Sequence, residues 1–319
     1  MILKKVLFPI LFFILLSSCD SDILSIKKYE EYTSKGYDYF YKDQFDSAFV
    51  YFDKSKAYSS KTNKENTIVY PIIMISEIQR IKNDYYGCEE SLTEALKYVD
   101  KNTDIIYLAF IYNNFALSYS ELADYKEALK YFNLSLKIAS TQKEKLIIQN
   151  NIAYNYLKQN QFKEAKNILE AIKKNDSLQK EPIEYARVLD NLGYAKFKLN
   201  QKNGINDLMK AKIIREENLN EVGLTATSMH LAEYYENSDI NLAKTYALKA
   251  FKYASKVENS DDKLEALQYL TRVSIGEESK KYALKSFLLN DSIKKVKQQA
   301  KNQFAKIKYD SKKAIEESQ

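Results

Sequence analysis

The chain has 319 residues, of which 45% are hydrophobic and 29% charged, so it can fold around a sizeable core. Its six glycines and three prolines are few, which argues against a turn-rich sheet protein and favours long helices joined by short polar links. The formal net charge of +6 does not call for nucleic acid, and no basic stretch of the body alternates with the aromatic residues that such a surface needs.

The first eighteen residues have the features of an export signal. Lys4 and Lys5 precede an apolar run over 6–16, which is shorter than the roughly 20 residues that cross a bilayer. The run is followed by "LSSC", which ends at Cys19 and resembles the lipobox of bacterial lipoproteins. The resemblance implies cleavage after residue 18 and a lipid on Cys19; the alternatives are a secreted soluble form and a cysteine without lipid.

A lipidated Cys19 implies a location at the cell envelope, outside the cytoplasm. Acyl chains on the new terminus give stable anchoring, because each buried methylene contributes about 0.8 kcal/mol. Residues 19–28 are then a short tether. The outer membrane is favoured, whereas the acidic residues after the cysteine leave the leaflet open.

The body of the chain, residues 29–291, repeats one pattern. Its clearest copy, "NNFALSYSELADYKEALKYFNLSLKIA" over 113–139, places small residues at Ala116 and Ala128 and aromatics at Tyr119, Tyr125 and Phe132. This resembles the tetratricopeptide repeat (TPR), a helix-turn-helix unit in which the small residues let the two helices approach and the aromatics fill the space between hairpins. The design is repeated over 150–172 and 190–214, and weaker copies occupy 34–58, 75–98, 229–254 and 264–289.

Such hairpins are amphipathic and cannot bury their apolar ridges alone. Stacking about seven of them produces a continuous core, so we expect an all-α, right-handed superhelical solenoid with a concave groove. The turn aromatics Phe45, Tyr85, Tyr125 and Phe162 lie 40, 40 and 37 residues apart, more than the 34 of the minimal repeat. The excess predicts longer linkers or an extra helical turn.

A ladder of asparagines marks the first helix of three consecutive hairpins. Asn113-Asn114, Asn150-Asn151 and Asp190-Asn191 occupy the same two positions, on the face that lines the predicted groove. An asparagine amide offers donors and an acceptor, so the ladder suits the backbone of an extended peptide. In the family, Asn114, Asn151 and Asn191 match the position commonly used to hold a bound peptide. The other candidate groove residues are Tyr154, Arg187, Tyr194 and Phe197.

A second interpretation of the ladder remains open. Asparagine is frequent at these positions of the repeat, so the ladder could serve only to tie one hairpin to the next. The sequence alone favours this second interpretation. A basic clamp for C-terminal carboxylates is not evident, because Arg187 is the only cation expected nearby on that face.

The sequence holds no catalytic or metal-binding motif. His230, the sole histidine, has no cysteine, aspartate or second histidine at ligand spacing, so we expect an ordinary surface or packing residue. Cys88 stands at a small-residue packing position, which predicts a buried structural thiol. We therefore expect no enzyme activity, no cofactor and no metal site.

The end of the chain departs from the repeat. Residues 292–319 predict a long basic helix, with eight lysines against one aspartate over 294–313 and only a weak coiled-coil seam. A solvated helical face is the simpler interpretation, and contact with lipid headgroups is the functional alternative.

The hairpins together with "NQFAKIKYDSKKAIEESQ" also resemble the exported TPR sensor region of bacterial membrane histidine kinases and helix-turn-helix regulators. The membrane helix and output domain do not follow in this sequence, so kinase or DNA-binding activity is not implied. The chain is then either a free-standing binding module or part of a longer sensor.

These observations lead to one expected function with two alternatives. We expect a non-catalytic module that binds a protein or peptide in the concave groove and is held at the membrane through Cys19, as the sensing or adaptor part of a signalling system. The alternatives are a structural scaffold lipoprotein in envelope assembly and a lipoprotein for surface nutrient capture. The ligand and the oligomeric state are left open.

Overall fold

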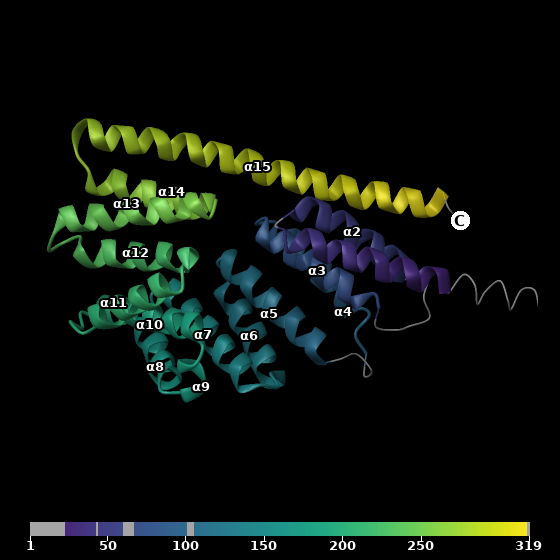
Figure 1. The fold of residues 1–319 in the computed structure, drawn as a ribbon, viewed down its shortest axis with the longest axis horizontal. Helices are drawn as coiled ribbons and strands as arrows, with labels where there is room; N and C mark the ends of the chain where they lie inside the picture. The colour runs from purple at the N-terminus through teal and green to yellow at the C-terminus, as the bar shows by residue number, and fades with distance from the viewer. Residues whose placement is uncertain (1–22, 43, 60–66, 101–104, 318–319) are drawn as a thin grey trace, which may run out of the picture. The chain divides into compact units, whose positions relative to one another are not determined.

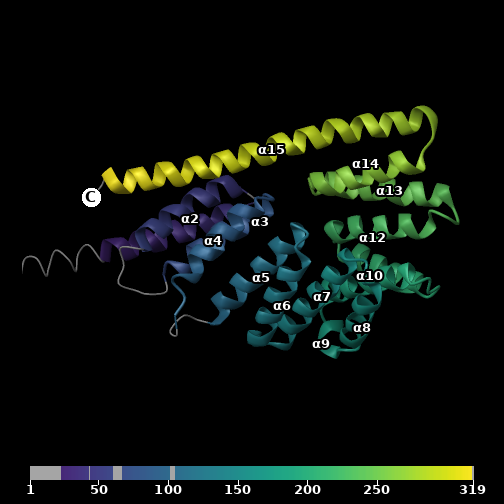
Figure 2. The same cartoon turned by 180° about the vertical axis from the view of Figure 1, so that it is seen from behind.

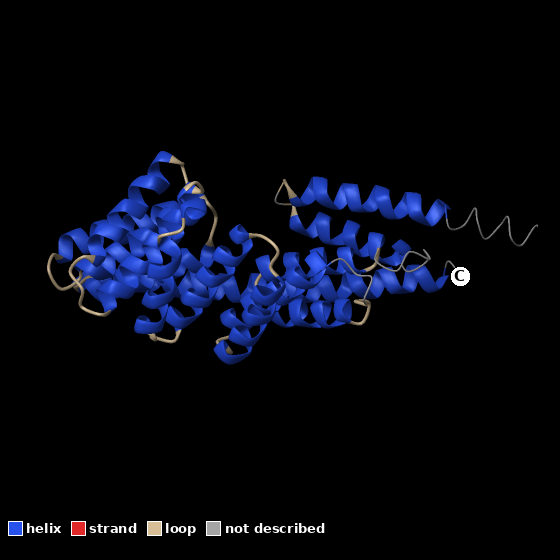
Figure 3. Ribbon diagram, turned by 90° about the horizontal axis from the view of Figure 1, so that it is seen from below, coloured by secondary structure: helices blue, strands red, loops and turns tan. Residues whose placement is uncertain are grey.

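The computed structural model describes residues 23–42, 44–59, 67–100 and 105–317, and the predicted leader and Cys19 lie outside these ranges. Figures 1 and 3 show that the described residues form helices joined by short connections, with no strand among them. The predicted all-α class is confirmed. Consecutive helices pair as antiparallel hairpins, as the repeat pattern predicts.

The chain divides into two compact units. Unit 1 comprises residues 1–131 and 297–319, and unit 2 comprises residues 132–296. Unit 1 begins with a helix over 23–40 and continues with α2 (Phe45–Ser59), α3 (Val69–Ile81), α4 (Tyr85–Leu96) and α5 (Ile105–Glu121). Helix α6 (Tyr125–Ile138) contains the boundary.

Unit 2 continues the same succession of hairpins. Its helices are α7 (Gln142–Lys158), α8 (Phe162–Lys173), α9 (Asp176–Gln179), α10 (Pro182–Lys198), α11 (Gly204–Glu217), α12 (Glu221–Tyr235), α13 (Ile240–Lys256) and α14 (Ser260–Val273). The short α9 lies in the connection between α8 and α10. Asn175 accepts a hydrogen bond from the Ser177 amide at 2.9 Å and so caps this single turn.

Four of the tight turns inside the hairpins share a backbone conformation. Asn83, Ala123, Asn160 and Asn200 each precede the second helix of a hairpin and have φ near 60° (59°, 61°, 59° and 59°). Asparagine tolerates this left-handed conformation better than most residues, which explains its recurrence. The turn aromatics at 85, 125 and 162 follow two residues later.

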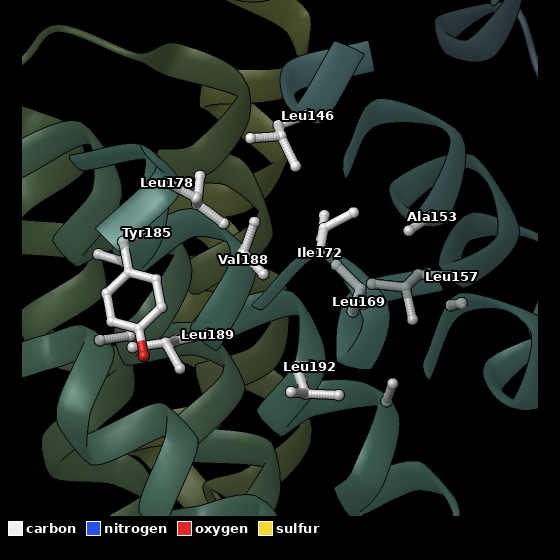
Figure 4. Close-up of a cluster of buried hydrophobic side chains, with 14 residues drawn as sticks. Leu146, Ala153, Leu157, Leu169, Ile172, Leu178, Tyr185, Val188, Leu189 and Leu192 are labelled. Carbon is white, nitrogen blue, oxygen red and sulfur yellow. The ribbon is translucent and has the colours of Figure 1, made fainter. Parts of the chain in front are cut away.

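The core of unit 2 forms where the small residues of the repeat allow helices to approach. Figure 4 shows Leu157 of α7, Leu169 of α8 and Leu192 of α10 in one buried cluster. Between α10 and α11, a Cβ on Gly193 would lie 2.8 Å from the Gly204 carbonyl oxygen. Gly193 thus lies at a close approach of α10 and α11, and any larger side chain there would push the two helices apart.

The core of unit 1 is more aromatic. Phe49 and Phe52 of α2 are buried against α3, and Phe115 of α5 stacks on Tyr131 with ring centroids 4.6 Å apart. Aromatic pairs of this kind contribute about 0.5–1.5 kcal/mol beyond the area they bury. Aromatic rings, tyrosine among them, thus fill the space between packed helices in this unit.

The last helix, α15 (Gly276–Glu317), is longer than the sequence predicts. Its first part pairs with α14, and Ile293 is buried in unit 2. The predicted start of a separate basic helix at residue 292 lies inside α15. No helix in the described part of the chain is long and apolar enough to cross a membrane.

Candidate functional site

The predicted groove residues of unit 2 come from successive first helices of hairpins, α7, α10 and α12, which can be followed in Figure 2. On α10, Arg187, Asn191 and Tyr194 are spaced by four and three residues, so their side chains lie on one helix face. We call the following set the asparagine face: Asn150, Asn151 and Tyr154 of α7; Arg187, Asp190, Asn191, Tyr194 and Phe197 of α10; His230 and Glu233 of α12.

Caps fix where each of these helices begins. Thr141 forms a capping box with Glu144 at the start of α7, and Pro182 occupies the first turn of α10. At the start of α12, the Asn220 side chain accepts a hydrogen bond from the Gly223 amide at 2.9 Å. These local signals determine the residue at which each helix begins.

We call each pair of polar side chains that joins the first helices of two neighbouring hairpins a rung of the ladder. The first rung, Asn150 with Asn191, is neutral. The Asn191 amide nitrogen donates to the Asn150 amide oxygen at 3.1 Å, and the two residues are only 5% and 2% exposed. A buried amide without its partner would cost about 1–3 kcal/mol, so this bond ties α7 to α10. The structure therefore gives Asn150 and Asn191 a role in joining hairpins.

The second rung occupies the same positions one hairpin later and is charged. The Nδ1 atom of His230 lies 3.2 Å from Oδ2 of the buried Asp190. Asp190 corresponds to Asn150, and His230 corresponds to Asn191. The sequence treatment of His230 as an ordinary residue missed this pairing. The available signal was the match between "HLA" at 230–232 and "NLG" at 191–193.

A second cation reaches Asp190 from the other helix of the hairpin. Nη1 of Arg215, on α11, lies 3.1 Å from Asp190 Oδ2 and donates to the Gly223 carbonyl oxygen at 2.7 Å and to Thr227. A Cβ on Gly223 would lie 2.5 Å from Arg215 Nε, so a small residue is needed there. Arg187 is thus not the only cation beside the ladder.

These partners decide the charge of Asp190. Burial alone would raise the pKa of this carboxyl, but Arg215 and then His230 oppose it and hold the pKa at about 2, below the usual 3.8. Asp190 is therefore ionised under all ordinary conditions. The asparagine face thus includes one buried carboxylate, that of Asp190, paired with the buried guanidinium of Arg215.

Aromatic and acidic side chains extend the face onto α12. Tyr194 stacks on His230 with ring centroids 4.1 Å apart, and its hydroxyl donates to Glu233 at 3.1 Å. Burial and the neighbouring Glu233 carboxylate raise the pKa of Tyr194, so the phenol stays protonated. Lys198 donates to the same Glu233 oxygen atom at 2.7 Å, which completes a network from α10 to α12.

The members open to solvent lie above these rungs. Tyr154 is 40% exposed, and Asn151, Arg187, Tyr194 and Phe197 are partly exposed. Arg187 forms an ion pair with Glu184 at 2.7 Å, while its Nε atom has no hydrogen-bond partner among the described residues. Amide, aromatic and guanidinium groups thus stand next to one another, a combination suited to binding a polypeptide.

The remaining ladder residues belong to unit 1. Asn114 of α5 is buried and Asn113 is partly exposed on the same helix. Nearby, the Ser118 hydroxyl donates to Cys88 Sγ at 3.2 Å, and burial raises the pKa of this thiol to about 12. The prediction of a buried structural thiol at Cys88 is confirmed. Among the described residues, no cluster of potential metal ligands occurs.

Comparison with known proteins supports the repeat architecture. A family model described as tetratricopeptide repeat matches residues 107–176, which include α6, α7 and α8. No curated protein sequence matches the chain.

Solved structures of similar fold cover most of the chain. The apo form of RapI matches with a TM-score of 0.68 at 18% identity, over 84% of this chain and 99% of RapI. A Rap protein in complex with competence and sporulation factor matches with a TM-score of 0.66 at 11% identity, over 84% and 76%. The Rap conjugation gene regulator of plasmid pLS20, in complex with the Phr* peptide, matches with a TM-score of 0.64 at 12% identity, over 84% and 75%. At these identities the likeness concerns the fold.

Proposed function

We propose that the chain is a non-catalytic module that binds a peptide or an extended protein segment on the asparagine face. One observation carries the proposal: Tyr154 is exposed and Asn151 and Arg187 are partly exposed, on the helices that the buried rungs hold in register. Side chains that are positioned before a ligand arrives lose less conformational entropy on binding. TPR-type stacks commonly use such a face for binding.

The structural relatives favour a peptide over other ligands. Two of the Rap structures hold a peptide or a named factor, and both share this fold over most of their length. The asparagine face offers the complementary chemistry, because amide groups bind an extended backbone whatever its sequence. Aromatic side chains beside them supply apolar area at low entropic cost.

We place this module at the cell envelope, held by a lipid on Cys19, as the sensing or adaptor part of a signalling system. The support is the "LSSC" pattern after the apolar run, and Cys19 lies outside the described residues. Metabolic labelling with an alkyne fatty acid should mark the wild type and not Cys19→Ser. Equal labelling of both forms would contradict the anchor.

The scaffold alternative makes a different prediction. A scaffold co-purifies with one membrane partner through a contact that tolerates changes on the asparagine face, whereas a peptide sensor does not tolerate them. Nutrient capture predicts a ligand that is not a polypeptide.

Binding is tested with peptides selected from a displayed random library, because the natural ligand is unidentified. Fluorescence anisotropy of the selected peptide should show binding weakened roughly tenfold or more in the triple variant Asn151→Ala, Tyr154→Ala and Arg187→Ala, since interface anchors of this kind contribute about 1 kcal/mol or more each. Each of these side chains is at least partly exposed, and circular dichroism should show an unchanged fold.

The matched control changes exposed residues on the second helices of the hairpins: Lys163→Ala, Asn167→Ala and Ile213→Ala. Its affinity for the selected peptide should equal that of the wild type. If no selected peptide binds, or if the two triple variants bind equally well, the asparagine face is not the binding site.

A further inference from the structure

The net positive charge of the protein is confined to one helix. Residues 280–313, all within α15, contain eleven lysines and two aspartates, which leaves 38 basic and 41 acidic residues in the rest of the chain. Charge that is segregated in this way creates a local field that attracts an extended anionic surface.

The first part of α15 also exposes an apolar face. Leu284, Phe287 and Leu288 are 59%, 69% and 58% exposed, and their spacing of three and four residues places them on one side of the helix. The opposite side faces the core of unit 2, where Tyr282 packs and Ile293 is buried. Three large apolar side chains are thus presented to water by a helix that is already anchored.

Lysines surround this apolar face. Lys280, Lys281 and Lys285 lie within about one turn of Leu284, and Lys294 and Lys295 follow further along the helix.

Acidic groups also lie on or beside the apolar face. Glu277 pairs with Lys280 at 2.6 Å and Asp291 pairs with Lys295 at 2.8 Å, while Glu278 pairs with Lys244 at 2.8 Å. Such exposed pairs contribute about 0–1 kcal/mol and are readily exchanged for other partners. The face therefore combines an apolar centre with a surplus of mobile cations.

This surface differs from the faces by which the hairpins stack. Within unit 2, α13 uses the fully buried alanines Ala243, Ala247 and Ala250, which let neighbouring helices approach. The outer face of α15 has leucine, phenylalanine and lysine instead, so it does not continue the stack. Pairing with a second copy would bring the lysines of both copies together, which electrostatics opposes.

We infer that α15 docks on an anionic lipid surface. The lysines contact headgroup phosphates, while Leu284, Phe287 and Leu288 enter the boundary between headgroups and acyl chains. The long lysine side chains suit this arrangement, because their methylene stems can lie along apolar surface while the charged ends stay in water. The docking surface is separate from the asparagine face and does not depend on peptide binding.

Vesicle sedimentation tests this inference with residues 19–319 carrying Cys19→Ser, a form that retains every described residue and has no lipid. The protein should pellet with vesicles of phosphatidylglycerol and phosphatidylcholine, and not with phosphatidylcholine alone. The triple variant Leu284→Ser, Phe287→Ser and Leu288→Ser should have a vesicle partition coefficient lower than that of the wild type by roughly tenfold or more. Lys280→Gln, Lys281→Gln and Lys285→Gln together should have a similar effect at low salt.

Two control variants match these changes elsewhere in unit 2. Ile183→Ser, Ile213→Ser and Val222→Ser remove exposed apolar side chains, and Lys163→Gln, Lys180→Gln and Lys202→Gln remove the same charge. Both controls should bind vesicles as the wild type does. Absence of pelleting with anionic vesicles, or equal loss in test and control variants, overturns the inference. Sedimentation velocity that shows a dimer lost in the Leu284 triple variant would assign the face to a second copy instead.

Discussion

Two rungs of the ladder in unit 2 both join the first helices of neighbouring hairpins, but one is neutral and the other is charged. Between α7 and α10, Asn150 and Asn191 form a single neutral hydrogen bond. One hairpin later the corresponding residues are Asp190 and His230, and Arg215 joins them from α11. The neutral rung needs only its two partners. The charged rung depends above all on the pair of Asp190 and Arg215, because a buried charge that loses its counter-charge is far costlier than a lost amide bond.

The largest effect should come from removing the carboxylate of the charged rung. Asp190→Ala leaves the buried Arg215 without its counter-charge, so we expect the free energy of unfolding to fall by about 3–5 kcal/mol. Urea denaturation at pH 7 measures this change. Glu217→Ala removes an exposed acidic residue from α11 and should change stability little. Equal effects of the two substitutions would mean that the Asp190 rung adds nothing to stability.

Acid should weaken the charged rung selectively. The pKa of Asp190 is held at about 2 in the folded chain against 3.8 ordinarily, so below pH 4 the unfolded state binds more protons than the folded state. The stability that Asp190 contributes is therefore complete above about pH 5 and is lost as the pH falls toward 2, by about 2 kcal/mol. Denaturation curves between these pH values should show this extra loss in the wild type relative to Asp190→Asn. Parallel curves for the two proteins would show that the carboxyl has an ordinary pKa.

The neutral rung should respond less to truncation. Asn191→Ala leaves the buried Asn150 amide without its donor, which should lower the free energy of unfolding by about 1–2 kcal/mol. The double variant with Asn150→Ala should lose less unfolding free energy than the two single variants together, because the hydrogen bond is already absent once either amide is removed. The exposed Asn167→Ala on α8 is the control. Strict additivity of the two rung substitutions would show that the amides do not interact.

The smallest effect should follow from making the second rung resemble the first. His230→Asn keeps a polar partner beside Asp190 but removes the ring that stacks on Tyr194, so we expect a loss of about 0.5–1 kcal/mol. Thermal unfolding followed by circular dichroism is sensitive enough to measure it. A loss as large as that of Asp190→Ala would mean that His230, and not Arg215, is the main counter-charge.

The repeat pattern predicted the hairpins well because its signals are local. Small residues of the repeat are expected where the two helices of a hairpin approach, and Gly193 lies at such an approach between α10 and α11. The asparagine ladder was also found, although its two interpretations depend on burial, which one sequence does not show. The structure assigns Asn150 and Asn191 to a buried bond and leaves Asn151 open to solvent. Peptide binding by the face remains a prediction.

The charged rung could not be predicted in the same way. Arg215 is 25 residues from Asp190 in the chain and lies on the second helix of its hairpin. Its side chain reaches the ladder only because α11 packs against both α10 and α12 and because Gly223 leaves room for it. No sequence pattern within one helix indicates that the Arg215 and Asp190 side chains are in contact.

The sequence by itself determined which segments are helices, where their tight turns fall and which faces are apolar, because periodicity, caps and turn residues act over a few neighbouring positions. Only the tertiary structure decided which polar residues are buried, which partner each one meets and that α15 runs without a break past residue 292. Those outcomes depend on the packing of helices that are distant in the chain, and packing sets the burial and charge on which binding rests.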